Sequence, residues 1–173
     1  MDAVDVFVDA CGTTAPVEKL GLVSYASQYS YGGVNNTSSD IDQRLNTDAN
    51  LVNTAIGRIS ARVFNGNTNI GAGIDNGTIV LTDSNARQYA EKTMVLLTDG
   101  YWNEGRNPVD AARDAAAEGI TIHCISFGAG ANQEDMRDIA EIGNGNYYHA
   151  PNSAALQAAF REIALTLPVI FAD

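Results

Sequence analysis

One short stretch constrains the fold of this 173-residue chain more than any other. Residues 92–100 read Lys-Thr-Met-Val-Leu-Leu-Thr-Asp-Gly, an apolar run that stops abruptly at a turn. Such a run is typical of a strand that is buried on both faces, as in a parallel sheet. Ligands of open α/β sheets bind beyond the carboxyl ends of such strands, which puts Asp99 at a candidate ligand position. A turn former or a helix cap explains an Asp at this position equally well.

Hydrophobic periodicity predicts further strands and helices on both sides of this stretch. The expected strands are 20–26, 92–99, 120–127 and 146–149, and the expected helices are 2–11, 48–63, 70–81, 107–118, 133–142 and 153–167. Residues 28–47 are polar and are expected to form a loop or an edge hairpin. This alternation of elements predicts a single α/β domain over residues 1–173, with a parallel, doubly wound sheet.

The charge and the cysteines narrow the classes of partner. The net charge is −11, from 21 acidic and 10 basic side chains, which disfavours nucleic acid and anionic membranes as partners. An acidic surface suits cation binding, although it more often only keeps a protein soluble. No apolar run approaches the ~18 residues that a membrane span needs. Cys11 and Cys124 match no metal-binding spacing and are expected to be two buried thiols, with a disulfide as the alternative.

Two features leave room for enzymatic chemistry. Gly128-Ala129-Gly130 follows a strand and precedes a helix, as a dinucleotide-binding loop would, but the third glycine position holds Gln133. A strand-to-helix turn is the favoured interpretation, and a nucleotide-binding, doubly wound enzyme is the alternative. His123 and His149 are isolated in the sequence, without a neighbouring ligand or nucleophile motif, and are expected to be structural.

Thr68 and Asp99 are a candidate pair of metal ligands. Each lies in an expected loop at the end of the sheet where parallel strands release their carboxyl termini. A hydroxyl and a carboxylate are hard oxygen ligands of the kind that Mg²⁺ takes, together with several waters. Two such ligands alone would bind this strongly hydrated ion weakly, so the pair predicts an incomplete site.

Several segments in their order along the chain resemble one known family. The segment 67–74, Asn-Thr-Asn-Ile-Gly-Ala-Gly-Ile, resembles the threonine motif of von Willebrand factor type A domains, and 94–100 resembles their Thr-Asp-Gly strand. The segments 119–128 and 145–150 are similar to the family's closing strands. The resemblance covers nearly the whole chain. Within the family, the chain is most similar to the bacterial type, such as the A domains of tight-adherence (Flp) pilus assembly proteins.

The resemblance implies a fold, a site and a role. The fold is a three-layer, Rossmann-like sheet wrapped by helices, with a metal-ion-dependent adhesion site holding Mg²⁺, Mn²⁺ or Ca²⁺. Thr68 would be the threonine ligand and Asp99 the acidic ligand, and an acidic group of a partner protein completes the metal's coordination. Such domains are adhesion or protein–protein interaction modules and not enzymes. An extracytoplasmic or cell-surface location, within a larger surface or pilus-assembly protein, follows from the resemblance alone. Tyr101 and Trp102 would flank the site as a contact surface, unless Trp102 packs under its own loop.

The chain departs from the family pattern in one serious respect. The family's Asp-x-Ser-x-Ser motif and the strand that it ends are absent, so the chain is interpreted as an N-terminally truncated domain with weak or no metal binding. A structural domain with a dead metal site is a further alternative. The missing strand is central in the family, and its loss predicts a gap of two strand spacings, ~9.5 Å.

The C-terminal run Leu-Pro-Val-Ile-Phe-Ala-Asp, residues 167–173, is apolar and ends in Asp, much like the missing strand. One hypothesis is that this run enters the gap, in its own chain or in a strand-exchanged homodimer. The alternative is an ordinary ending of the last helix at the edge of the domain.

Overall fold

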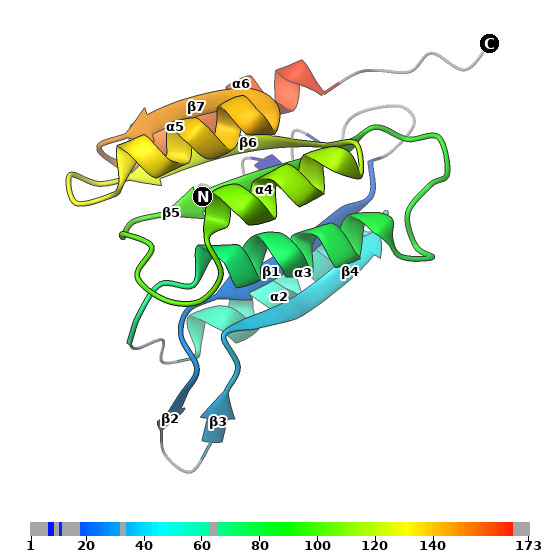
Figure 1. Cartoon of the computed structure of the whole chain (residues 1–173). Helices are drawn as coiled ribbons and strands as arrows, with labels where there is room; N and C mark the ends of the chain where they lie inside the picture. Colours follow the sequence, from blue (N-terminus) through cyan, green and yellow to red (C-terminus); the bar gives the residue numbers. More distant parts are fainter. Residues whose placement is uncertain (1–6, 9–10, 12–17, 32–33, 63–65, 168–173) are drawn as a thin grey trace.

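The strands fall into groups that do not pair with one another (Figure 1). The computed structural model describes residues 7–8, 11, 18–31, 34–62 and 66–167. One antiparallel pair consists of β1 (Leu20–Tyr25) and β4 (Ser39–Asn46), and a small hairpin consists of β2 (Tyr29–Tyr31) and β3 (Val34–Asn36). A parallel sheet has the order β5 (Lys92–Thr98), β6 (Ile120–Phe127) and β7 (Asn144–Ala150). The predicted α/β class is confirmed. Residues 28–47, expected to be a loop or an edge hairpin, form the β2–β3 hairpin only in their first part; the strand β4, which pairs with β1, was not predicted because its sequence is polar.

Each helix whose start lies among the described residues begins at a polar residue that satisfies backbone groups of the first turn. The helices are α2 (Ala49–Ser60), α3 (Ile70–Thr82), α4 (Pro108–Ala117), α5 (Gln133–Ile142) and α6 (Ser153–Thr166). Their caps are Asp48, Asn69, Asn107, Asn132 and Asn152, and each side chain accepts a hydrogen bond from a backbone N–H. An amide or carboxylate oxygen here replaces the intrahelical acceptor that the first turn lacks. The predicted helix starts at Asp48 and Asn107-Pro108 are confirmed.

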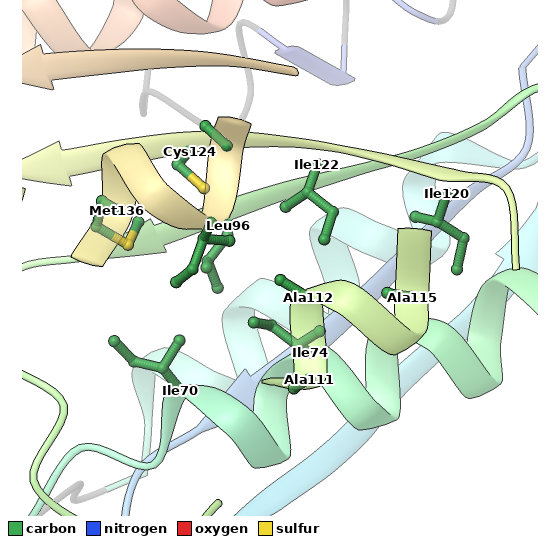
Figure 2. Packing of buried hydrophobic residues seen from close by; sticks show 12 residues of the cluster. Ile70, Ile74, Leu96, Ala111, Ala112, Ala115, Ile120, Ile122, Cys124 and Met136 are labelled. Carbon is green, nitrogen blue, oxygen red and sulfur yellow. The ribbon is translucent and has the colours of Figure 1, made fainter. Parts of the chain in front are cut away.

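The parallel sheet is covered on both faces, which explains why its strands are continuously apolar. β5 and β6 run in unbroken register from Lys92 opposite Ile120 to Thr98 opposite Ser126. Helices α3, α4 and α5 cover one face, and α6 covers the other (Figure 1). Figure 2 shows the first core, whose buried members are Ile70, Ile74, Leu96, Ala111, Ala112, Ala115, Ile120, Ile122, Cys124, Met136, Ile139 and Ala140.

Helix α3 packs against both groups of strands and joins them. A Cβ on Gly73 would lie 2.6 Å from the ring of Tyr25 on β1, and a Cβ on Gly77 would lie 2.7 Å from the methyl of Met94 on β5. Both distances are shorter than a van der Waals contact allows, so glycine lets the helix approach both strands closely. The helix therefore bridges the interruption between β1 and β5.

The described strands are interrupted between β1 and β5, and the predicted gap of two strand spacings stays a prediction. Among the described residues, no strand lies between β1 and β5, and these two strands border a shared cleft. Residues 168–173 lie outside the described residues, so the hypothesis that they fill the gap stays a prediction. The predicted helix 2–11 also lies largely outside them, although residues 7, 8 and 11 are helical. Cys11 and Cys124 are buried thiols, as expected. Within the described part of the chain, no helix is both long and apolar enough to cross a membrane.

Candidate metal centre at the carboxyl edge of the sheet

The fold brings Thr68 and Asp99 into neighbouring loops. Thr68 precedes α3, and Asp99 directly follows β5. The Thr68 Oγ1 atom lies 3.2 Å from the position that a Cβ on Gly100 would take, so the hydroxyl rests against the turn that carries Asp99. Asp99 is exposed and Thr68 is half-buried. Two oxygen ligands from distant parts of the sequence thus lie at one edge of the sheet.

Three hydrogen bonds hold these two loops together. The Thr68 backbone N–H donates to Asn103 Oδ1 at 2.7 Å, and the Asn103 backbone N–H donates to the Thr68 carbonyl at 3.3 Å. The Asn67 side-chain amide donates to Glu104 Oε2 at 3.1 Å. The reciprocal pair between Thr68 and Asn103 fixes the backbone of both loops. Asn103 and Glu104 therefore position the two loops that carry Thr68 and Asp99.

Two further residues tie the Thr68 loop to the end of β1. The Asn69 N–H donates to the carbonyl of Ala26 at 3.1 Å, and the Asn67 N–H donates to Ser27 Oγ at 3.0 Å. Asn69 is also 93% buried because it packs against Gly105, whose φ of +78° favours glycine. Sequence reasoning missed Ser27 and Asn69. An Asn directly before the helical run at Ile70 was a helix-cap signal that could have identified Asn69.

The two aromatic residues of the loop differ in their exposure. Tyr101 is 59% exposed, whereas Trp102 is half-buried and packs against the first core. The Trp102 indole N–H donates to the carbonyl of Glu104 at 2.7 Å, which closes the loop on itself. Trp102 therefore follows the alternative interpretation, and Tyr101 alone remains available for contact with a partner.

The donor set fits a divalent cation only in part. A hydroxyl and a carboxylate suit Mg²⁺ and similar hard cations, which favour oxygen ligands. Among the described residues, no group of three or more His, Cys, Asp or Glu side chains could hold a metal ion. Thr68 and Asp99 could together supply two protein ligands, and waters or another group would have to supply the rest.

The glycine loop at 128–130 lacks the charge pattern of a phosphate site. Its helix α5 begins with Asn132, whose side chain accepts hydrogen bonds from the N–H groups of Glu134 and Asp135 at 3.1 and 3.3 Å. Burial and then the charges of Asp138 and Glu134 raise the pKa of Asp135. A phosphate needs free N–H donors and positive potential at such a helix start. This acidic, capped terminus disfavours the nucleotide-binding alternative.

The histidines belong to hydrogen-bond networks between β6 and β7. Ser126 Oγ lies 2.9 Å from His149 Nδ1 and 2.7 Å from the Tyr147 hydroxyl, and His123 Nδ1 accepts a hydrogen bond from the Asn146 N–H at 3.0 Å. Ser126 has no solvent exposure, so no substrate atom can reach its hydroxyl. The Ser–His contact therefore ties two strands together, and nothing in it resembles an accessible nucleophile.

Comparison with known proteins agrees with this architecture. A sequence model described as von Willebrand factor type A domain matches residues 4–162. A Bacillus subtilis (strain 168) protein, the uncharacterized protein YwmC, is 31% identical over 78 residues, which cover 44% of this chain and 34% of that protein.

Two solved structures illustrate the shared fold. Proximal thread matrix protein 1 from the mussel byssus, with a zinc-occupied MIDAS motif, has a TM-score of 0.71 at 21% identity over 95% of this chain and 41% of its own. The open form of the pilus adhesin SpaC from Lactobacillus rhamnosus GG has a TM-score of 0.69 at 15% identity over 95% of this chain and 27% of its own. The chain thus spans less than half the length of each of these proteins.

Proposed function

The chain belongs to the von Willebrand factor type A domain family, and on that premise we propose that it is a binding module whose contact edge carries a partial metal-ion-dependent adhesion site. Domains of this family act as protein-interaction modules. The observation that carries the proposal is the contact between the Thr68 hydroxyl and the Asp99–Gly100 turn, in two loops that are hydrogen-bonded to each other. Thr68 and Asp99 are the proposed protein ligands.

The charge of the chain gives the cation a physical role. With a net charge of −11, the surface repels an acidic partner at long range. A bound Mg²⁺, Mn²⁺ or Ca²⁺ supplies a local positive charge that an acidic side chain of a partner can coordinate. The exposed Tyr101 beside the site adds apolar contact area with a polar tip, which suits an interface. We therefore propose a protein partner that offers a carboxylate.

The proposed setting is a larger surface protein. SpaC is a pilus adhesin, and this chain covers only 27% of that structure. By this similarity we propose an extracytoplasmic location, within a bacterial surface or pilus-assembly protein. The same fold with a dead metal site is the competing proposal, because two ligands hold a hydrated ion weakly. The two proposals differ in whether the loops that carry Thr68 and Asp99 bind divalent cations.

Paramagnetic Mn²⁺ tests the site with residue resolution, because it broadens the amide signals of nearby residues even when it binds weakly. We expect broadening first in the loops 66–69 and 99–104. Asp99→Asn should abolish it there, whereas the matched control Asp110→Asn, an exposed carboxylate on α4, should leave it unchanged. Equal broadening across the acidic surface, or broadening in these loops that survives Asp99→Asn, would refute the site. The absence of any broadening would favour the dead-site proposal.

A further inference from the structure

The β2–β3 hairpin projects from the body of the molecule beside the candidate metal centre. Figure 1 shows it extending from the end of β1, away from the helices and from the parallel sheet. Among the described residues, its two strands pack mainly against each other. The Ser30 hydroxyl on β2 donates to Asn35 Oδ1 on β3 at 2.5 Å, and both residues are exposed. The hairpin is therefore a surface feature that is held together mainly by its own contacts.

The base of the hairpin is fixed to the loop that carries Thr68. The Ala26 N–H donates to the Ser38 carbonyl at 3.0 Å, which pairs the two chain segments at the base. The Ala26 carbonyl accepts the N–H of Asn69, and the buried Ser27 hydroxyl accepts a second N–H from the same loop. A two-stranded hairpin alone is only marginally stable in water. These bonds therefore fix where the hairpin stands relative to the metal centre.

The hairpin carries no charge, although the chain is strongly acidic. Residues 20–39 contain no Asp, Glu, Lys or Arg, whereas the net charge of the chain is −11. Protein surfaces usually carry charged side chains at about a quarter to a third of their positions. The described residues Gln28, Ser30, Asn35 and Thr37 are all exposed, so this neutral segment lies on the surface. An acidic partner is repelled less here than by the charged parts of the surface.

The composition of the hairpin is typical of a protein-binding surface. Residues 28–38 read Gln-Tyr-Ser-Tyr-Gly-Gly-Val-Asn-Asn-Thr-Ser. Tyr, Ser, Gly and Asn are also the residues that predominate in the binding loops of antibodies. There, Tyr adds contact area at a small cost in conformational entropy, and the small polar residues adapt their hydrogen bonds to the partner. Such a surface binds through shape and neutral hydrogen bonds and does not depend on charge.

We propose that the β2–β3 hairpin is a second contact surface for the protein partner of the metal centre. The partner offers an uncharged, hydrogen-bonding face to the hairpin, next to the carboxylate that it offers to the cation. This inference rests on the proposed function, which supplies the partner with a carboxylate. The hairpin adds contact area without charge repulsion. It also selects among partners, because a carboxylate alone is common to all acidic proteins.

Peptide display on the full chain tests the proposal. The probe is a phage-displayed library of random peptides with one fixed Asp, selected in excess Mg²⁺. The enriched peptides should carry uncharged residues beside that Asp. Gln28→Glu combined with Asn35→Asp adds two negative charges with little change in shape and keeps the acceptor for Ser30. This double variant should weaken binding of the enriched peptides at least about tenfold, because like charges across an interface repel.

The matched control places the same two substitutions elsewhere on the surface. Asn53→Asp on α2 combined with Gln88→Glu in the loop before β5 changes two exposed positions. It adds the same charge to the chain and should weaken binding by less than about twofold. Equal midpoints of thermal unfolding for the two double variants show that any difference in binding is not a loss of fold.

Asp99→Asn separates this proposal from the metal site on which it rests. Binding that Asp99→Asn weakens and the hairpin variant leaves unchanged would overturn the hairpin proposal and keep the metal site. Binding that the hairpin variant weakens, but that survives Asp99→Asn and a chelator, would refute the metal site and support the hairpin surface. Enrichment of peptides with further acidic residues beside the Asp, or of no peptide at all, would also overturn the hairpin proposal.

Discussion

The parallel sheet β5–β6–β7 and the antiparallel pair β1–β4 differ in how far they are buried and paired. In the parallel group, β6 lies between two paired neighbours and six of its eight residues are buried. In the antiparallel pair, β1 has a partner on one edge only among the described residues, and none of its own six residues is buried. The parallel group is a complete layered core, and the β1–β4 pair is attached to it through α3. The comparison shows that the packing of α3 joins two groups of strands that no strand pairing connects in the described part of the chain.

The largest expected effect is the loss of the bridge from α3. Ile74 has no solvent exposure and packs against the parallel group in the first core. Ile74→Ala should lower the free energy of unfolding by about 2–5 kcal/mol, because it leaves a cavity in addition to the lost apolar burial. Denaturant titration measures this change.

Ile79→Ala serves as the control on the same helix, since Ile79 is 48% exposed and should change stability by less than about 0.5 kcal/mol. Equal effects of the two substitutions would show that the buried face of α3 does not join the two groups of strands.

The two glycines of α3 separate its contacts with each group. Gly73→Ala places a methyl against the Tyr25 ring, which cannot move without shifting β1, and should cost about 1–3 kcal/mol. Gly77→Ala meets the flexible end of Met94, which can rotate away, while alanine improves helix propensity by up to about 1 kcal/mol. Thermal unfolding should therefore show a lower midpoint for the first variant and little change or a gain for the second. The reverse order would contradict the close packing of α3 on β1.

A smaller effect is expected from the hydrogen bond that crosses the cleft. Tyr25→Phe removes the donor to the Leu97 carbonyl and should cost about 0.5–1.5 kcal/mol, the usual net value of one such bond. Tyr89→Phe is the matched control, because the Tyr89 side chain is 88% exposed and should be neutral. Denaturant unfolding of both variants measures the difference. A neutral Tyr25→Phe would show that the Leu97 carbonyl has another partner.

The smallest expected effect is a change in how stability depends on pH, caused by His123 on β6 of the parallel sheet. Burial lowers the pKa of His123 in the folded state below its ordinary value of 6.5. The unfolded state then binds the proton more readily, so stability is complete above about pH 6.5 and falls as the pH drops toward the lower folded pKa. Stability measured between pH 7 and 5 should fall less steeply for His123→Gln than for the natural chain. If stability depended on pH equally in both proteins, His123 would not contribute to the loss of stability at low pH.

The sequence predicted most helices and strands because their signals are local. The apolar runs of β5 and β6, the caps at Asp48 and Asn107, and the helical spacing of Ile70 and Ile74 needed no knowledge of the fold. The interruption between β1 and β5 was expected only from the family resemblance, which places a further strand between them. The hydropathy pattern of a strand does not indicate which other strand pairs with its edge.

The site was predicted less completely for a similar reason. Thr68 and Asp99 were recognised as ligand types at strand and loop ends, and the structure places their loops side by side. The supports of that arrangement, Ser27 and Asn69, act through hydrogen bonds between segments about 40 residues apart. Such contacts leave no periodic signal. The partial burial of Trp102 likewise depends on its contact with the first core, whose residues are distant in the sequence.

Calorimetric titration of the chain with Mg²⁺ tests the central claim, that its contact edge retains two ligands of an incomplete metal site. The account predicts binding too weak to produce a micromolar isotherm, because a hydroxyl and one carboxylate cannot replace enough of the ion's hydration shell. A micromolar Kd that Asp99→Asn abolishes would contradict this account and show that the chain already holds a complete site.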